Sequence, residues 1–300
     1  MPIEIKLLSS PGWEDYELVD SGNGAKLERF GPYTFARPDH QAVWRPAKTE
    51  KVWGAAHGIF HPTGEESGGR WEFKKPVPAA WQMHYKGLAL WARTGGSRHL
   101  GIFPEQAAHW DWIEGQVRAA QQPVRVLNLF GYTGVATLAA ARAGAQVTHV
   151  DASKKTVAQA RENQALSGLD DRPIRWIVDD ALKFIRREAR RNAFYEGLIL
   201  DPPKFGRGPK GEVWELFEAL PSLLDECRAI LSKSLKFVVF TAYAIRASAL
   251  TIHYALDEMV SDRRGNQETG ELVTVERSAG RMLSNAIYTR WANEAAGEQE

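Results

Sequence analysis

Two short segments, each at the end of an apolar run, constrain most strongly how this chain folds. Residues 124–134 read Val-Arg-Val-Leu-Asn-Leu-Phe-Gly-Tyr-Thr-Gly, which is typical of a strand that passes through a glycine turn into a helix. About seventy residues later, the apolar run 198–200 ends in Asp201-Pro202-Pro203-Lys204. Ligands of open α/β sheets bind outside the carboxyl ends of the strands. We therefore expect a cofactor pocket and a reaction site at one edge of one parallel sheet.

The chain after residue 102 alternates apolar runs with stretches long enough to form helices. The candidate strands are residues 124–130, 146–151, 174–178, 197–201 and 235–242. The candidate helices are residues 106–121, 133–143, 156–167, 182–191 and 213–231. Continuous apolar strands separated by helices indicate a parallel sheet that is covered on both faces. Two later runs, 272–276 and 286–291, predict a closing antiparallel edge, and residues 295–300 are expected to be frayed.

The first hundred residues have a different character. They contain six of the eleven tryptophans, and proline recurs often enough to break any long helix. Short β-like runs lie at residues 16–19, 27–30, 33–36, 70–73 and 88–94. We predict a small, mostly β domain over residues 1–102 and an α/β domain over residues 103–300. Most of the early tryptophans are expected in the core, with stacking on nucleic-acid bases as the alternative.

Composition limits the class of protein. Charged residues make up 25% of the chain and the net charge is +1, so a nucleic-acid partner would need a local basic patch. Cys227 is the only cysteine, which excludes an intramolecular disulfide. The first residues show no signal-peptide pattern and no apolar run reaches membrane-spanning length, so we expect a cytoplasmic protein. His57 and His61 are four residues apart, but Gly58 and Pro62 disrupt a helical metal site, and we predict no metal.

Gly131 and Gly134 stand where the first strand of the α/β region becomes a helix. A glycine there lets the backbone approach a ligand closely, and the helix start offers free N–H groups to an anion or polar group. The spacing is not the Gly-x-Gly-x-x-Gly of dinucleotide-binding proteins. By itself this segment is equally consistent with a tight turn.

Acidic residues at the ends of the next two strands strengthen the case for a cofactor. Asp151 follows Gly131 by 20 residues, where a carboxylate can accept hydrogen bonds from ribose hydroxyls. The alternative is a helix cap for residues 156–167, although Ser153 can supply that cap instead. Asp179-Asp180-Ala181 ends the third strand, and Asp180 is placed to receive an adenine amino group. One of these two acids is expected to be only a helix cap.

The loop Asp201-Pro202-Pro203-Lys204-Phe205 ends the fourth strand. The two prolines remove two N–H donors and fix two φ angles, which stiffens the wall of a site. A plain turn would rarely need an acid, two prolines, a cation and an aromatic residue in succession. We interpret this loop as the border of the reaction site.

These segments resemble the S-adenosylmethionine-dependent methyltransferases, and more closely the bacterial 23S ribosomal-RNA methyltransferases of the cytosine-C5 group. The likeness lies in Leu-Asn-Leu-Phe-Gly-Tyr-Thr-Gly (127–134), Val-Asp-Ala-Ser (150–153), Glu-Asn-Gln-Ala-Leu-Ser-Gly-Leu (162–169) and Asp-Pro-Pro-Lys-Phe (201–205). Gly-Ile-Phe-Pro-Glu-Gln (101–106) resembles the group's linker into the catalytic domain. The resemblance covers about residues 85–245. It implies a Rossmann-like, seven-stranded α/β methyltransferase sheet beside the smaller β domain.

The resemblance also implies roles for single residues. Residues 130–134 would hold the methionine end of S-adenosylmethionine, Asp151 the ribose and Asp180 the adenine, while Asp201 would border the methyl-transfer site. The full set of cofactor residues is Asn128, Phe130, Gly131, Tyr132, Thr133, Gly134, Asp151, Ala152, Ser153, Asp179, Asp180, Ala181 and Asp201. The catalytic set is Asp201, Pro202, Pro203 and Lys204.

Two departures from that group change the expected reaction. The group carries an RNA-binding module ahead of its β domain, and this chain is expected to have the β domain alone. The group also uses a cysteine just after the fifth strand, because a thiolate must attack the cytosine ring. Here that stretch reads Phe240-Thr241-Ala242-Tyr243, and Cys227 lies in a helical pattern that indicates a structural role. The cytosine C5 atom is therefore not the expected target.

Two basic clusters are candidates for contact with RNA phosphates. Arg186, Arg187, Arg190 and Arg191 form a helix end that is equally well explained as a solvated face. Lys204, Arg207 and Lys210 adjoin the Asp201 loop, and we predict Phe205, Arg207 and Lys210 as substrate-binding residues. The predicted function is methyl transfer from S-adenosylmethionine to a base of ribosomal RNA, more plausibly at a nitrogen. The rivals are a methyltransferase of a protein or small molecule, and a non-catalytic RNA-binding module that retains cofactor affinity.

Overall fold

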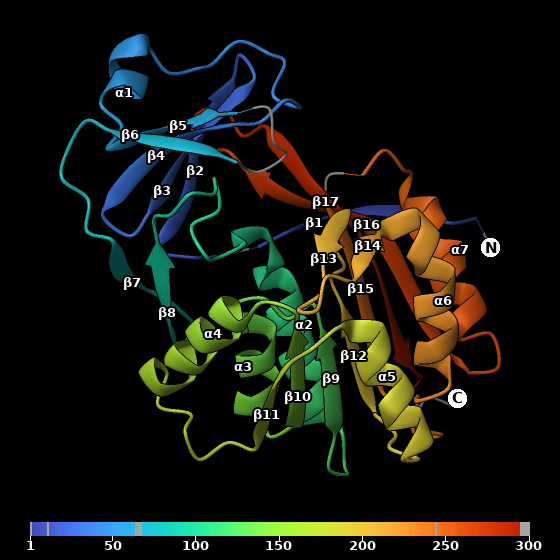
Figure 1. Cartoon of the computed structure of the whole chain (residues 1–300). Coiled ribbons are helices and arrows are strands. Elements are labelled where there is room, and N and C mark those ends of the chain that lie inside the picture. Colours follow the sequence, from blue (N-terminus) through green and yellow to red (C-terminus); the bar gives the residue numbers. More distant parts are fainter. Residues whose placement is uncertain (1, 11, 64–67, 244, 295–300) are drawn as a thin grey trace. The chain divides into compact units, whose positions relative to one another are not determined.

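An eight-stranded sheet organises the larger part of the chain in the computed structural model, which describes residues 2–10, 12–63, 68–243 and 245–294 (Figure 1). The strands, in spatial order, are β1 (Ile5–Ser9), β16 (Gly265–Val275), β17 (Met282–Asn293), β15 (Phe237–Tyr243), β12 (Gly197–Leu200), β9 (Arg125–Leu129), β10 (Gln146–Asp151) and β11 (Ile174–Val178). The five strands from β15 to β11 pair in parallel, and β17 pairs with β15 in antiparallel fashion. The predicted α/β methyltransferase fold with its closing antiparallel strands is confirmed.

Helices cover both faces of this sheet, as the continuous apolar strands predicted. They are α2 (Ala107–Ala119), α3 (Val135–Arg142), α4 (Lys154–Leu166), α5 (Ala181–Arg190), α6 (Leu216–Arg228) and α7 (Ala249–Met259). On β9, Leu127 and Leu129 belong to the core cluster that α5, α6 and α7 cover, whereas Val126 packs with α2 and α3. Figure 1 shows α4 on the same side as α3. Side chains that alternate along one strand therefore fill two separate apolar layers.

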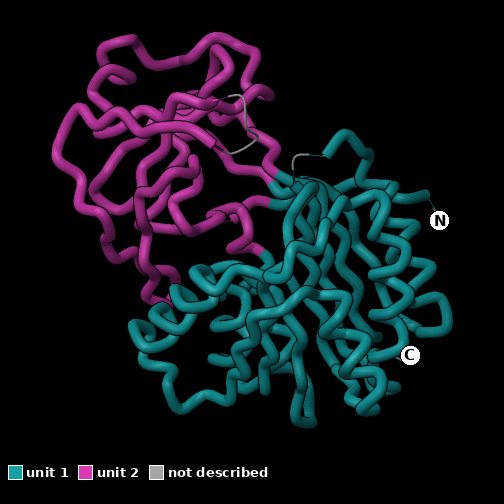
Figure 2. The backbone as a smooth tube through the Cα atoms, in the orientation of Figure 1, with its two compact units in different colours: residues 1–8, 109–272, 286–300 teal, residues 9–108, 273–285 magenta. Residues whose placement is uncertain are grey.

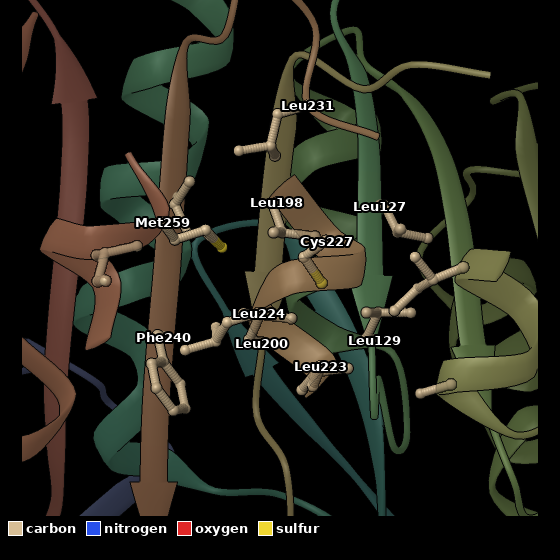
Figure 3. Close-up of a cluster of buried hydrophobic side chains, with 14 of the residues drawn as sticks. Leu127, Leu129, Leu198, Leu200, Leu223, Leu224, Cys227, Leu231, Phe240 and Met259 are labelled. Carbon is tan, nitrogen blue, oxygen red and sulfur yellow. The ribbon is translucent and has the colours of Figure 1, made fainter. Parts of the chain in front are cut away.

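Cys227 lies inside the layer under α6 and is fully buried (Figure 3). Leu198, Leu223 and Leu224 are among the apolar residues packed around it in the same cluster. Burial raises the pKa of the Cys227 thiol well above its usual value, so the group stays protonated. The prediction that Cys227 lies on a helix, away from the strand ends, is confirmed.

The structure departs from the sequence prediction at three points. Residues 213–231 were expected to form one helix, but Val213–Glu215 forms strand β14, which pairs with β13 (Phe205–Arg207), and α6 begins only at Leu216. The main sheet has eight strands because β1 joins the edge beside β16, and no alternating pattern at residues 5–9 signalled it. Helix α7 was also not predicted; the Ser248 hydroxyl caps it by accepting a hydrogen bond from the Leu250 amide.

The chain divides into two compact units (Figure 2). The first contains residues 1–8, 109–272 and 286–300, and the second contains residues 9–108 and 273–285. The end of β16, the start of β17 and the turn between them, residues 273–285, therefore belong to the second unit. The predicted boundary between a β domain and an α/β domain at residue 102 stays a prediction, and residues 295–300, expected to be frayed, lie outside the described residues.

The second unit is mostly β, as predicted from its turns and tryptophans. Its five-stranded sheet has the order β2 (Tyr16–Gly22), β3 (Ala25–Phe30), β4 (Tyr33–Pro38), β5 (Gly58–Pro62) and β6 (Gly69–Phe73). The remaining elements are the pair β7 (Ala80–Tyr85) and β8 (Leu88–Arg93), helix α1 (Glu50–Gly54) and the short 3₁₀ helix Pro104–Gln106. The predicted hairpin between β2 and β3 is confirmed, with Asn23 and Gly24 at positive φ.

The early tryptophans serve the interior of this unit. Two of the six, Trp13 and Trp81, are buried. The other four are half-buried: Trp44, Trp53, Trp71 and Trp91. Five of the six donate their indole N–H to a partner in the same unit, for example Trp53 to Asp20 over 2.8 Å. These hydrogen bonds fix the indoles within the unit, but only Trp13 and Trp81 are buried outright, so the prediction that most of the six are core residues is met in part. No helix in the described part of the chain is long and apolar enough to cross a membrane.

Candidate cofactor and acceptor site

Strand register brings the predicted site segments to one edge of the sheet. Leu129 of β9 lies beside Val150 of β10 and beside Leu200 of β12, and Asp151 lies beside Val178 of β11. The residues that follow these strands therefore emerge next to one another. They are the glycine turn after β9, Ala152 and Ser153 after β10 (whose last residue is Asp151), Asp179 with Asp180 and Ala181 after β11, and the Asp201 loop after β12.

The glycine turn has an unusual backbone. Phe130, Tyr132 and Gly134 have positive φ angles of 58°, 50° and 85°, of which only the glycine adopts such a value without strain. A Cβ atom added to Gly131 would lie 2.4 Å from Cε1 of His149, so this position admits no side chain. Two non-glycine residues in the left-handed region are held there only because the surrounding structure compels it.

A buried polar chain beneath the turn supplies part of that constraint. Asn128 Nδ2 donates to Thr137 Oγ1 over 2.9 Å, and Thr137 Oγ1 lies 2.9 Å from Nδ1 of His149. Burial lowers the pKa of His149 to about 3, so the ring is neutral at physiological pH. The sequence predicted Asn128 but neither Thr137 nor His149. A single histidine within an apolar strand gave no signal, because only the fold shows that it lies under Gly131.

Asp151 connects the turn to the next helix. Its Oδ2 accepts a hydrogen bond from the Tyr132 amide over 2.9 Å, and its Oδ1 accepts from the Ser153 amide and the Thr156 hydroxyl over 2.8 and 2.9 Å. The cap of α4 itself is Ser153, whose hydroxyl accepts from the Thr156 amide. Ser153, and not Asp151, therefore caps α4, which is the arrangement that the sequence left open.

The two acids after β11 are engaged differently. Asp180 is the cap of α5, where its Oδ1 accepts from the Lys183 amide over 2.9 Å. Asp179 accepts from the Asp180 amide and forms an ion pair with Arg187. One acid was expected to be only a cap. The acid with the capping bond is Asp180, to which the resemblance gave the adenine role, and that role remains a prediction.

The Asp201 loop is tied to the hairpin that follows it. The Pro203 carbonyl accepts a hydrogen bond from the Trp214 indole N–H over 2.6 Å, and the Lys204 carbonyl accepts from the Leu216 amide over 3.0 Å. Pro202 is buried, whereas Pro203, Lys204 and Phe205 are exposed. Two backbone carbonyls of the predicted catalytic segment, those of Pro203 and Lys204, thus already accept hydrogen bonds from β14 and the start of α6.

The hairpin β13–β14 presents its outer face beyond the loop. Phe205 and Val213 are exposed, and Arg207 lies directly opposite Val213 in the pairing. At the turn of this hairpin, Glu212 accepts from the Lys210 amide and forms an ion pair with Lys183 of α5. The three predicted substrate residues, Phe205, Arg207 and Lys210, are therefore on one short hairpin.

Among the described residues, no group of three or more His, Cys, Asp or Glu side chains could hold a metal ion. His57 accepts a hydrogen bond from the Thr34 amide, and His61 pairs with Glu72 over 2.8 Å. The two histidines are not on a shared helix, because residues 58–62 form β5.

This strand order and glycine turn define a class of enzyme. Residues 39–232 match the model of the S-adenosylmethionine-dependent methyltransferase family. The chain belongs to that family, and its cofactor is S-adenosylmethionine.

Particular relatives refine the relationship. The chain is similar to a crystal structure of an S-adenosylmethionine-dependent methyltransferase from Agrobacterium tumefaciens, with 48% identity, a TM-score of 0.92, and coverage of 96% of this chain and 94% of that one. It is 41% identical over 81 residues to ribosomal RNA large subunit methyltransferase I of Shewanella denitrificans, which is 27% of this chain and 20% of that protein. It is 42% identical over 90 residues to ribosomal RNA large subunit methyltransferase K/L of a Shewanella species, which is 29% of this chain and 13% of that protein. The chain thus spans only a fifth or less of the length of these ribosomal-RNA enzymes.

The residues of the turn fit this cofactor. Gly134 is the N-cap residue immediately before α3 and supplies no side-chain cap, which leaves first-turn amides of an eight-residue helix for a ligand carboxylate. Because Gly131 has no Cβ, the backbone of the turn can lie directly against the ring of His149. Asp151 is the last residue of β10, the position at which an acid binds the ribose in dinucleotide-binding α/β sheets.

Proposed function

We propose that this enzyme methylates a base of ribosomal RNA without a covalent cysteine intermediate. The observation that carries the proposal is the register of β9 and β12, which sets the Asp201 loop beside the glycine turn. The partial relatives named above are ribosomal-RNA methyltransferases, which supports RNA as the acceptor. We also retain a cytoplasmic location as part of this proposal.

A nitrogen is the acceptor atom that this chain suits best. Methylation of cytosine C5 requires a thiolate to attack the ring, and the single cysteine of the chain is buried on the inner face of α6 with a raised pKa. An amine or ring nitrogen has its own lone pair and needs only correct positioning. S-adenosylmethionine supplies the activated methyl group.

In this proposal each segment has a separate task. Residues 130–134 with Asn128 bind the methionine end, Asp151 with Ala152 and Ser153 binds the ribose, and residues 179–181 border the adenine. Asp201 accepts a hydrogen bond from the acceptor nitrogen and so orients that nitrogen. Pro202, Pro203 and Lys204 form the rigid wall. Rigid support of this kind keeps the reacting atoms in line, which is the main source of acceleration in such a transfer.

The hairpin β13–β14 supports an RNA path beside the loop. The side chains of Arg207 and Lys210 form no ion pair within the described chain. In the rival basic cluster, by contrast, Arg186, Arg187 and Arg191 are each paired with an acid. Cations without an internal partner are the ones available to phosphates. The exposed ring of Phe205 offers a surface on which an extruded base can stack.

The test is methyl transfer from labelled S-adenosylmethionine to ribosomal RNA from a strain that lacks this gene, followed by mass mapping of the modified nucleoside. We expect incorporation into RNA by the native protein and a loss of about 100-fold or more with Asp201→Ala, at a cofactor affinity changed only a few-fold. Incorporation into protein or small molecules instead would favour the first rival. Cofactor and RNA binding without any transfer would favour the second.

A further inference from the structure

Trp214 stands between the two halves of the site, although nothing in the sequence drew attention to it. It lies on β14 opposite Gly206 of β13, and its side chain is 6% exposed. Because side chains alternate along a strand, Trp214 points inward while its neighbours Val213 and Glu215 are exposed. The outer face of the hairpin is thus exposed to solvent, and Trp214 is the large aromatic residue on its inner face.

The first contact of Trp214 is with the acceptor loop. Its indole N–H donates to the Pro203 carbonyl over 2.6 Å. A Cβ atom at Gly206 would lie 3.4 Å from Cγ of Pro203 and 3.9 Å from Cβ of Trp214, so both rings pack over the bare backbone of Gly206. The direction of the Pro203 peptide plane therefore depends on where the indole sits.

The second contact of Trp214 is with the cofactor turn. Its ring centroid lies 5.0 Å from that of Phe130, at an interplanar angle of 53°. Phe130 is the non-glycine residue held at a φ of 58° at the start of the turn. A shift of the turn on cofactor binding would move the Phe130 ring, and close packing transmits such a movement to the indole.

We propose that Trp214 is a positioning residue that couples occupancy of the cofactor turn to the geometry of the Asp201–Lys204 loop. The proposal rests on the cofactor and acceptor roles given above to Phe130 and the Asp201 loop. The indole packs against the turn through its ring and holds the loop through its N–H. Binding of the cofactor then orders the acceptor wall before the acceptor arrives, so the methyl donor is in place first.

A first experiment needs no acceptor. Amide hydrogen exchange is measured with and without S-adenosylhomocysteine in the native protein and in Trp214→Phe, which retains an aromatic ring but has no N–H donor. In the native protein we expect the ligand to slow exchange both at residues 130–134 and at residues 203–216. In Trp214→Phe the slowing should persist at the turn and be lost at the hairpin. Trp291→Phe is the matched control, because Trp291 is also buried in the same unit but lies on β17, beside Val238 of β15.

A second experiment reads the reaction. Trp214→Phe should lower kcat for RNA methylation by about 10- to 100-fold, because a small misplacement of the acceptor wall is costly, while KM for the cofactor changes by about threefold or less. Trp291→Phe should lower the melting temperature but leave kcat within about twofold, the effect of a merely structural tryptophan.

The outcomes separate this inference from the proposed function. If the native protein methylates no RNA, the proposed function fails, and hydrogen exchange alone decides the coupling. If the ligand slows exchange at the turn of the native protein but not at the hairpin, the coupling is refuted, and no variant is needed to reach that result. Equal ligand effects in the native protein and in Trp214→Phe would also refute it.

Discussion

The backbone amide of Tyr132 donates a hydrogen bond to Oδ2 of Asp151 over 2.9 Å. This bond joins the glycine turn after β9 to the end of β10, the two segments expected to hold opposite ends of the cofactor. With Ser153 and Thr156 on its other oxygen, Asp151 already accepts three of the about four hydrogen bonds open to a carboxylate. The acid therefore shapes the turn, and about one acceptor position remains for the predicted contact with the ribose.

Replacing Asp151 by alanine should weaken cofactor binding. The ribose hydroxyls lose their acceptor and the Tyr132 amide loses its partner, so we expect the affinity for S-adenosylmethionine to fall about 10- to 100-fold. Isothermal titration calorimetry measures the change. Asp151→Asn should lose less affinity, because its amide oxygen can still accept from Tyr132, and the exposed Asp171 provides the control as Asp171→Ala. Unchanged affinity in Asp151→Ala would remove this residue from the site.

Replacing Cys227 by serine should preserve methyl transfer. The thiol lies in the apolar layer under α6, so a hydroxyl in its place costs about 1–3 kcal/mol of unfolding free energy without reaching the site. Chemical denaturation and RNA methylation are measured on the same preparation, with Cys227→Ala as the companion variant. A folded but inactive Cys227→Ser, or covalent trapping of the protein by RNA that contains 5-fluorocytosine, would overturn the cysteine-free mechanism.

His109 on α2 should make the unfolding free energy of the protein fall at acidic pH. Neither ring nitrogen has a hydrogen-bond partner among the described residues, and burial, together with Arg290, lowers the pKa of His109 to about 3. The histidine of the unfolded chain takes up a proton near pH 6.5, and that of the folded chain does not. The contribution of the neutral His109 ring to the unfolding free energy is therefore complete above that pH and is lost as the pH falls toward 3.

Replacing His109 by phenylalanine, which can keep the ring contact with Tyr288, should remove that loss. Between pH 7 and pH 5 the native protein should lose about 2 kcal/mol more unfolding free energy than His109→Phe. Urea unfolding at the two pH values measures the difference. Equal losses in the two proteins would show that the ring is protonated in the folded state.

Neutralising Arg207 and Lys210 together should weaken RNA binding and its dependence on salt. Each cation that meets a phosphate releases a counterion, so the slope of log affinity against log salt should flatten by about two. Binding titrations at several salt concentrations give the slope for the native protein and for Arg207→Gln with Lys210→Gln. Arg186→Gln with Arg191→Gln is the matched pair, since both residues are engaged in ion pairs and should leave the slope unchanged. An unchanged slope in the first variant would move the RNA path away from the hairpin.

Local sequence determined the order and type of most elements. The apolar runs 146–151 and 174–178 form β10 and β11 with the expected bounds, because β-branched and apolar residues between turn signals have few other stable arrangements. The motifs around Gly131, Asp151 and Asp201 were found for the same reason: each needs only its own strand end to be recognised. Parallel strands then bring their carboxyl ends together, which is a rule of topology and not of the particular sequence.

Tertiary structure decided which partners those motifs meet. His149 and Thr137 lie under Gly131, and Trp214 reaches both Phe130 and Pro203, through contacts between residues that are 11 to 84 positions apart. The start of the predicted helix 213–231 became a strand because residues 205–207 offered it a backbone partner, which overrode the local helical preference. Local patterns thus determine where strands and turns form. The close packing of side chains from distant segments decides which of them can act together.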